Sequence, residues 1–267
     1  MKKNEIEILG IKKNKRTYTV HTSLDKYIFQ EESILKYQLF TGAIFSQAEW
    51  KEILKQEGKH QFLSKALNYL SFAKRSKGEI SKYLQEKGAV FSQIHFVLEK
   101  LSEIGYIDDA KLAQDLVQTY AVEKLYGPKL IEQKLTEKHF SPKDIENALS
   151  NYDAEQISSN ISSIVEKELR KNKQYPVKKQ QQKLFEKCYR MGYDAQDLYE
   201  KLANITFEDE SYPKLMKDCK KAVEKYQTKQ LSAAELKQKV IQNLLQKGYD
   251  YSSILQAFVD IEEDILI

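Results

Sequence analysis

The sequence predicts a mostly α-helical protein, in which tandem three-helix repeats stack into an elongated curved array behind a small N-terminal β-meander. Two observations predict this fold class. The 267 residues include only nine glycines and four prolines, whereas average usage is roughly 7% and 5%. Such a chain cannot make the many tight turns of a β-sandwich or a propeller. In addition, one pattern of apolar residues recurs four times after residue 60.

Composition also excludes several classes. No run of 18 apolar residues occurs, so we expect no membrane-spanning helix, and no apolar stretch typical of a secretory signal follows the N-terminus. Two cysteines, Cys188 and Cys219, are too few for a disulfide framework, and we therefore expect a reducing, cytoplasmic location. The net charge of +4 permits an anionic partner without requiring one.

The first residues predict β structure. Apolar and acidic residues alternate around Ile6 and Ile8, and the segments 17–20 and 27–29 are rich in β-branched and aromatic residues. This pattern is typical of three short strands in a meander. Ser46 and Glu49 then form a capping-box pattern that opens a helix, which we expect to end at Gly58-Lys59.

The fourfold pattern is centred on four helix-ending positions about 50 residues apart, Gly88, His139, Gly192 and Gly248. Each has apolar residues eight and four positions before it and six and ten positions after it. These sixteen residues are Ile80, Leu84, Ile94, Leu98, Ile131, Leu135, Ile145, Leu149, Leu184, Cys188, Leu198, Leu202, Val240, Leu244, Ile254 and Phe258. Residues four apart share one face of a helix, so each copy predicts two helices joined at a residue with left-handed backbone.

A third helix is predicted upstream of each pair, for example through Leu112, Leu116 and Tyr120. Three-helix units of this kind bury their faces by stacking on their neighbours. The predicted divisions are 1–59 for the β element and its helix, then repeats at 60–108, 109–152, 153–205 and 206–267.

Three motifs then identify a family. They are Lys74-Arg75-Ser76, Gly105-Tyr106-Ile107-Asp108-Asp109 and Gly127-Pro128-Lys129-Leu130-Ile131, and in this order and spacing the chain resembles the RecX family over about residues 62–152. The β element and the fourth repeat look similar to those of the longer members. Ala89 and His139 depart from the family pattern, and both departures concern helix ends.

The resemblance implies a function that composition could not. It implies a modulator, mainly an inhibitor, of the RecA recombinase, which binds in the groove of RecA–single-stranded-DNA filaments and limits filament growth and strand exchange in homologous recombination. It also implies a protein that is not an enzyme. We expect a cytoplasmic monomer whose partners are the RecA filament and single-stranded DNA, with double-stranded DNA as an alternative, and with no membrane partner.

The sequence contains no convincing catalytic group. Asp108 and Asp109 are a conspicuous carboxylate pair, but a helix N-cap explains them better than a metal or acid–base role does. The four histidines match no zinc spacing, and no nucleotide-binding or hydrolase signature occurs. Cys188 falls on an apolar position of the repeat. We therefore predict no cofactor, no metal and no catalytic residue.

Two groups of basic residues are the candidate DNA-binding or filament-binding residues. Residues 167–190 carry a net charge of +7, from Lys167, Arg170, Lys171, Lys173, Lys178, Lys179, Lys183, Lys187 and Arg190 against Glu168 and Glu186. A second, weaker group comprises Lys74, Arg75, Lys77 and Lys82, with Lys129 and Lys134 in the next repeat, where Lys124 and Lys138 also lie. Each group either binds DNA phosphates or is an ordinary solvated helix face. The tyrosines, similarly, either stack on bases or pack at helix ends.

Two hypotheses from different classes remain. The first is the RecA-filament modulator that the resemblance implies. The second is a helical-repeat nucleic-acid-binding protein that acts independently of RecA. An effect that depends on RecA distinguishes them.

Overall fold

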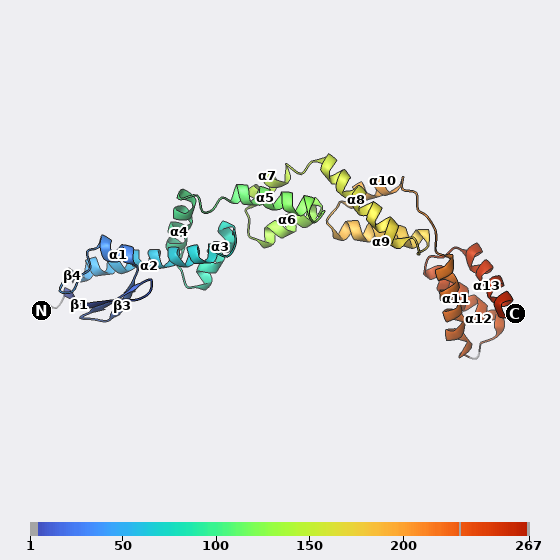
Figure 1. Cartoon of the computed structure of the whole chain (residues 1–267), viewed down its shortest axis with the longest axis horizontal. Helices are drawn as coiled ribbons and strands as arrows, with labels where there is room; N and C mark the ends of the chain where they lie inside the picture. The colour runs from blue at the N-terminus through green and yellow to red at the C-terminus, as the bar shows by residue number, and fades with distance from the viewer. Residues whose placement is uncertain (1–4, 230, 266–267) are drawn as a thin grey trace. The chain divides into compact units, whose positions relative to one another are not determined.

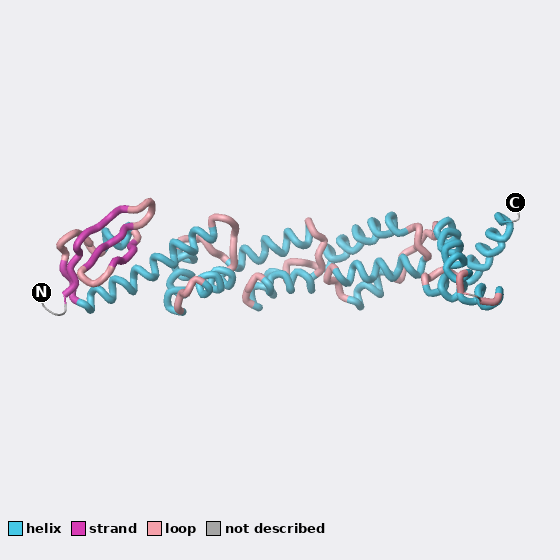
Figure 2. Tube along the Cα trace, turned by 90° about the horizontal axis from the view of Figure 1, so that it is seen from below, coloured by secondary structure: helices cyan, strands magenta, loops and turns pink. Residues whose placement is uncertain are grey.

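The computed structural model describes residues 5–229 and 231–265. A small antiparallel sheet lies at the N-terminal end of the chain, and nearly all other regular structure is helical (Figure 1; Figure 2). The elements are β1 (Glu5–Lys13), β2 (Tyr18–Thr22), β3 (Lys26–Phe29), α1 (Glu31–Lys36), β4 (Ile44–Ser46), α2 (Gln47–Leu70), α3 (Lys77–Glu86), α4 (Phe91–Glu103), α5 (Asp109–Val122), α6 (Pro128–Glu137), α7 (Pro142–Leu149), α8 (Ala154–Asn172), α9 (Val177–Arg190), α10 (Ala195–Leu202), α11 (Tyr212–Gln227), α12 (Ala233–Gln246) and α13 (Tyr251–Ile265).

The chain forms two compact units. The first comprises the residues up to Ala113 together with Leu135–Asn147, and the second comprises Gln114–Lys134 together with the residues from Ala148 onward. The division passes through α5, α6 and α7 instead of between helix triplets. The repeat boundaries drawn from the sequence therefore remain a prediction.

The sheet has the strand order β3-β2-β1-β4 with antiparallel neighbours throughout. Three of its strands are those the sequence predicts. The fourth, β4, has three residues, too few to show an alternating pattern. Ile8, Val20 and Phe29 are fully buried on one face of the sheet, where they pack against Trp50 of α2. The ring centroids of Phe29 and Trp50 lie 5.6 Å apart.

Helix α2 begins where the sequence predicts and ends elsewhere. The capping box is present, because the Ser46 hydroxyl accepts from the Glu49 backbone N–H (3.2 Å) and the Glu49 carboxylate accepts from the Ser46 backbone N–H (2.8 Å). The predicted end at Gly58 is wrong, since α2 continues to Leu70 and crosses the predicted boundary after residue 59. A glycine inside a helix costs about 1 kcal/mol, but the helix continues past it and buries Ala66 in the core of the first repeat.

The four predicted helix ends are confirmed. Gly88, His139, Gly192 and Gly248 all have positive φ, and His139, at +59°, occupies the same left-handed region as the three glycines. In each copy, the residue that follows donates its backbone N–H back to a carbonyl five residues earlier, as in Tyr193 N–H to Cys188 O at 3.3 Å. This is the hydrogen bond of a Schellman cap.

The apolar positions of the pattern form the repeat cores. The two residues before each helix end are at most 1% exposed in all four copies, and the first residue after it is buried in each copy as well. The second residue after it is half-buried in three copies, as Leu98 is. The triplets α2–α3–α4, α5–α6–α7, α8–α9–α10 and α11–α12–α13 are thus the three-helix repeats that the sequence predicts (Figure 1).

Neighbouring repeats meet where the C-terminal end of the middle helix of one repeat contacts the N-terminal end of the middle helix of the other. In the first unit, the Ser76 hydroxyl at the start of α3 donates to the Lys138 carbonyl just after α6 (2.5 Å). A Cβ added to Gly78 would lie 2.2 Å from the His139 carbonyl oxygen. In the second unit, the Gly127 N–H at the start of α6 donates to the Met191 carbonyl just after α9 (2.7 Å).

These head-to-tail joints are electrostatically favourable, because the positive N-terminal end of one helix meets carbonyl groups at the negative C-terminal end of another. They also require small residues. A Cβ on Gly127 would lie 2.5 Å from the Gly192 carbonyl. The corresponding approach of Gly248 to Lys178 and Lys179 is looser, with the nearest atoms at 3.7 Å.

Candidate nucleic-acid interface

The hairpin of α8 and α9 carries the strongest basic segment. Asp153 is the N-cap residue of α8, and its carboxylate accepts from the Gln156 backbone N–H (2.8 Å). Ile161 and Ile164 of α8 are buried with Leu184 and Cys188 of α9. Because these apolar residues occupy the shared face, most basic side chains of residues 167–190 lie on the remaining faces of the two helices.

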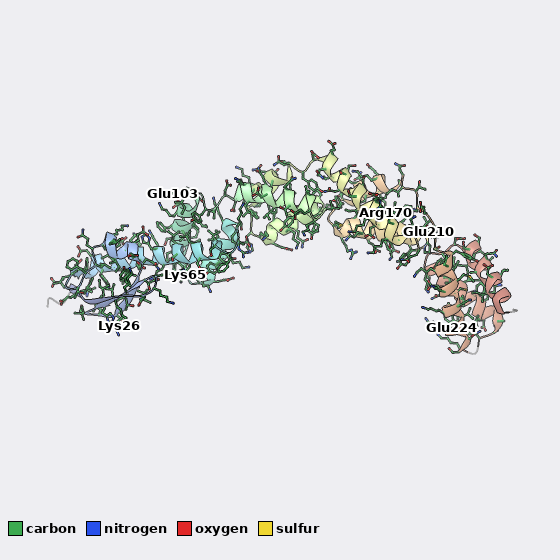
Figure 3. All side chains as sticks on the ribbon, in the orientation of Figure 1. Lys26, Lys65, Glu103, Arg170, Glu210 and Glu224 are labelled. Carbon is green, nitrogen blue, oxygen red and sulfur yellow. The ribbon has the colours of Figure 1, made fainter. Side chains whose placement is uncertain are left out.

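Two of the nine basic side chains are already neutralised. Arg170 forms an ion pair with Glu166 one turn earlier. Lys173 forms ion pairs with Glu208 and with Glu210 (3.6 Å), which belong to the segment before α11. Figure 3 labels Arg170 and Glu210 in this part of the chain. Hydrogen bonding to Glu208 raises the pKa of the Lys173 ammonium. The effective charge of the segment is therefore smaller than its sequence indicates.

Three others are held by neutral partners. The Lys183 ammonium lies 3.7 Å from the centroid of the Tyr175 ring, a cation–π contact. The Lys179 ammonium donates to the Gln182 amide oxygen (2.9 Å), and the Arg190 Nε donates to the Glu186 carbonyl (3.4 Å). These side chains keep their charge, but their positions are set by their neighbours.

Exposed, unpaired charge remains at Lys167, Lys171 and Lys178. Among the described residues, no carboxylate oxygen lies within 4.0 Å of these ammonium groups, and all three side chains are exposed. Lys187 likewise has no such partner but is half-buried. The three exposed lysines are the groups of this segment best placed to meet a phosphate.

A larger share of the side chains in the weaker basic group than in the basic segment 167–190 have partners within the protein. Arg75 is half-buried, pairs with Glu79 (3.2 Å) and stacks over Tyr69 at 4.9 Å. Lys129 forms an ion pair with Asp194, the N-cap residue of α10. Lys74 and Lys134 also have partners.

Lys77 and Lys82 are exposed. Lys82 lines a hollow of about 250 Å³ with Tyr69, Tyr83, Glu79 and Glu86. Lys74, Arg75, Lys77 and Lys82 belong to the first compact unit, whereas Lys129, Lys134 and the whole basic segment belong to the second.

Asp108 and Asp109 are both helix caps. The Asp108 carboxylate accepts from the Lys111 backbone N–H (3.0 Å) at the start of α5. The Asp109 carboxylate accepts from the Lys77 backbone N–H (2.9 Å) and so caps α3 of the preceding repeat, a contact that the sequence did not reveal. Burial raises the pKa of the Asp109 carboxyl. The structure therefore accounts for this pair without any reacting group.

Other chemically capable groups have structural surroundings. Burial raises the pKa of the Cys188 thiol to about 11, which leaves it protonated and unreactive at neutral pH. Within residues 5–229 and 231–265, no cluster of three or more His, Cys, Asp or Glu side chains could hold a metal ion. No described helix is long and apolar enough to cross a membrane.

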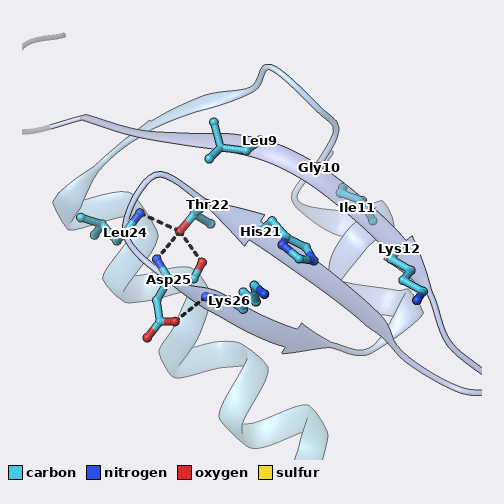
Figure 4. A pocket seen from close by; sticks show the side chains of 9 residues that line it. All are labelled: Leu9, Gly10, Ile11, Lys12, His21, Thr22, Leu24, Asp25 and Lys26. Atoms are coloured by element: carbon cyan, nitrogen blue, oxygen red, sulfur yellow. Dashed lines mark hydrogen bonds between the residues drawn. The ribbon is translucent and has the colours of Figure 1, made fainter.

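The outer face of the sheet holds a further group of polar residues, with two lysines, that the sequence analysis did not single out. Antiparallel register places Gly10 opposite His21 and His21 opposite Lys26. With Lys12, these residues line a shallow hollow of about 670 Å³ at the position where Gly10 lacks a side chain (Figure 4). The alternation of inward-facing and outward-facing residues along each strand could have indicated this face, but only the strand register shows which residues of different strands share it.

Comparison with known proteins yields a consistent set of relatives. Models of the first and the third three-helix domains of RecX match residues 63–101 and 208–258. "Regulatory protein RecX" of Listeria monocytogenes serotype 4a is 31% identical over 248 residues, which cover 91% of each chain. Its namesake from Staphylococcus carnosus is 29% identical, over 91% of this chain and 92% of the relative.

Solved structures give the same fold. A crystal structure of a regulatory protein RecX has a TM-score of 0.60 at 24% identity, and covers 75% of this chain and 100% of the other. Two helix triplets, α5–α7 and α8–α10, lie between the two segments matched by the domain models. This chain therefore has one triplet more than a three-domain arrangement.

Proposed function

The chain belongs to the RecX family of regulatory proteins, and from this premise we propose that it regulates the RecA recombinase. In this proposal it binds in the groove of the RecA–single-stranded-DNA filament and limits filament growth and strand exchange. The observation that carries the proposal is the match to regulatory relatives over 91% of the chain.

The basic segment supplies the contact with DNA in this proposal. Lys167, Lys171 and Lys178 are exposed and have no carboxylate within 4.0 Å among the described residues. Ammonium groups of this kind replace the counterions around phosphates, and the released counterions drive binding. RecA itself provides the rest of the binding surface.

The protein acts by binding rather than by catalysis in this proposal. Its most conspicuous carboxylates, Asp108 and Asp109, each accept a hydrogen bond at a helix start. The Cys188 thiol is buried. These side chains have packing or capping roles, which supports a regulator that works through its surface.

The test measures ATP hydrolysis by RecA on single-stranded DNA with and without the full-length protein. We expect inhibition by the wild-type chain and weaker inhibition by the triple variant Lys167→Glu, Lys171→Glu, Lys178→Glu. In direct DNA-binding assays, the dependence of log affinity on log salt should flatten by about 2, because each phosphate contact on a single strand contributes about 0.7.

The matched control reverses the charge of three exposed lysines outside both basic groups, Lys143→Glu, Lys217→Glu and Lys221→Glu. It changes net charge equally and should leave the salt slope near the wild-type value. Equal effects of the two triple variants would mean that only net charge matters. DNA binding without any effect on RecA would favour the RecA-independent nucleic-acid-binding protein instead.

A further inference from the structure

An aromatic groove of about 560 Å³ lies along α9 and α10, beside the basic segment. We propose that this groove binds unstacked nucleobases of single-stranded DNA, which stack on Tyr199 and Phe185 while the neighbouring phosphates lie toward Lys178. This inference rests on the proposed function, because it concerns the same DNA. It adds a second kind of contact, which depends on bases rather than on charge.

The rings form one connected surface. The Phe185 and Tyr199 centroids lie 4.9 Å apart at 34°, so the last turns of α9 meet α10 through these side chains. Tyr189 follows Phe185 by one turn of α9, and the two rings are nearly parallel, with their centroids 6.2 Å apart. Phe207 lines the groove as well. Stacked rings of this kind offer flat faces to a further planar group.

Tyr189 and Tyr199 are more exposed than tyrosines that pack in the core of this repeat. Tyr199 is 68% exposed and Tyr189 is 57% exposed. Tyr193 of the same repeat shows the alternative, since it is 1% exposed and its hydroxyl donates to the Leu125 carbonyl (2.9 Å). Packing therefore accounts for Tyr193, whereas Tyr189 and Tyr199 present their rings to solvent.

The other groove residues fit a nucleic-acid strand better than an apolar peptide. Besides the rings, Leu202 and Ala203 line the groove, and the amide of the exposed Gln181 can donate to and accept from base edges. Lys178 lines the same groove. Glu186 lines the groove as well and accepts a hydrogen bond from the neutral amide of Gln182 (2.8 Å). Aromatic platforms beside lysines are the usual means of binding single strands without sequence preference.

The experiment uses full-length protein and two fluorescent probes of the same length. One probe is oligothymidylate of about 20 nucleotides, long enough for a typical single-strand site, and the other has the same backbone without bases. Tyr199→Leu removes the ring and keeps an apolar side chain. Tyr251→Leu is the matched control, because Tyr251 is 55% exposed in the same compact unit and does not line the groove.

We expect Tyr199→Leu to weaken binding of oligothymidylate by about tenfold, the loss of roughly one stacked base. Binding of the abasic probe and the salt slope should not change, and Tyr251→Leu should match the wild type with both probes. Tyr189→Leu provides a second variant with a weaker effect of the same kind.

Several outcomes would overturn the inference. One is that Tyr199→Leu and the wild type bind oligothymidylate equally, and another is that the wild type binds both probes equally. If Tyr199→Leu instead weakens inhibition of RecA while binding of both probes is unchanged, the groove contacts protein. The lysine triple variant separates this failure from that of the proposed function. If it loses affinity for both probes while Tyr199→Leu does not, only the nucleobase site is wrong.

Discussion

Replacing Gly78 with alanine tests the head-to-tail joint between α3 and α6. Gly78 lies in the first turn of α3, where alanine is intrinsically favoured over glycine by up to about 1 kcal/mol. If α3 did not contact the end of α6 at this position, Gly78→Ala should therefore be slightly more stable than the wild type. With the joint, the new Cβ would lie 2.2 Å from the carbonyl oxygen and 2.4 Å from the Cβ of His139.

The size of the stability loss in Gly78→Ala depends on whether the atoms of His139 can move away from the new Cβ. The His139 carbonyl is backbone in a left-handed residue (φ +59°), so it cannot turn away as a flexible side chain would. Forcing an extra methyl group into such a contact typically costs about 1–3 kcal/mol. After subtraction of a gain in helix propensity of about 1 kcal/mol, we expect the free energy of unfolding to fall by up to about 2 kcal/mol.

Gly58→Ala in α2 is the matched control. Its new Cβ would lie 2.8 Å from Nε2 of Gln93, the far end of a flexible side chain that can move aside. This variant should be as stable as the wild type or more stable. The measurements are urea unfolding followed by circular dichroism and amide hydrogen exchange at Lys77, whose backbone N–H donates to Asp109 at the joint. The close contact between Gly78 and His139 would be contradicted if Gly78→Ala gained stability as Gly58→Ala does and the Lys77 amide stayed protected from hydrogen exchange.

Two further predictions concern helix caps. Asp109→Ala removes the acceptor for the Lys77 N–H and should lower the free energy of unfolding by about 1 kcal/mol, whereas Asp109→Asn keeps an acceptor oxygen and should cost less; equal losses in urea unfolding would argue against a capping role. Hydrogen bonds from Ser252 and Ser253 lower the pKa of Asp250 to about 2. A lowered folded-state pKa gives stability that is present above the unfolded value of about 3.9 and is lost as the pH falls through about 2. Asp250→Ala should therefore destabilise by about 1 kcal/mol at pH 7 and much less at pH 2, and a loss independent of pH would contradict this.

Local interactions explain why much of the helical architecture was predictable. A left-handed residue, a capping box and an apolar i, i+4 pair each depend on residues within a few positions of one another. Ser76 with Glu79 and Ser232 with Glu235, for example, form capping boxes between residues three positions apart. The helix end at His139 was predictable for the same reason, although the residue is not glycine.

The errors arose where distant residues decide the structure. Gly58 resembles a helix end, yet α2 continues, and past this point the Gln61 side chain donates to the Ile28 carbonyl 33 residues away (2.8 Å). Strand β4 exists because Ile44–Ser46 pairs with Glu5–Glu7 of β1. Neither contact leaves a local pattern in the sequence.

The sequence by itself determined the repeated helix pattern, its helix ends, a capping role for Asp108 or Asp109, and the family, since these depend on short-range chemistry and on the order of motifs. Only the tertiary structure decided which lysines of the basic segment lack a carboxylate partner and so can contact a phosphate. Lys173 is neutralised by Glu208 and Glu210, whereas Lys171, two residues earlier, has no carboxylate within 4.0 Å among the described residues. It also decided that Asp109 caps the preceding repeat and that Phe185 and Tyr199 share a groove. The physical reason is that ion pairs, caps between repeats and aromatic surfaces join side chains separated along the chain, and their distances are set by how the helices pack.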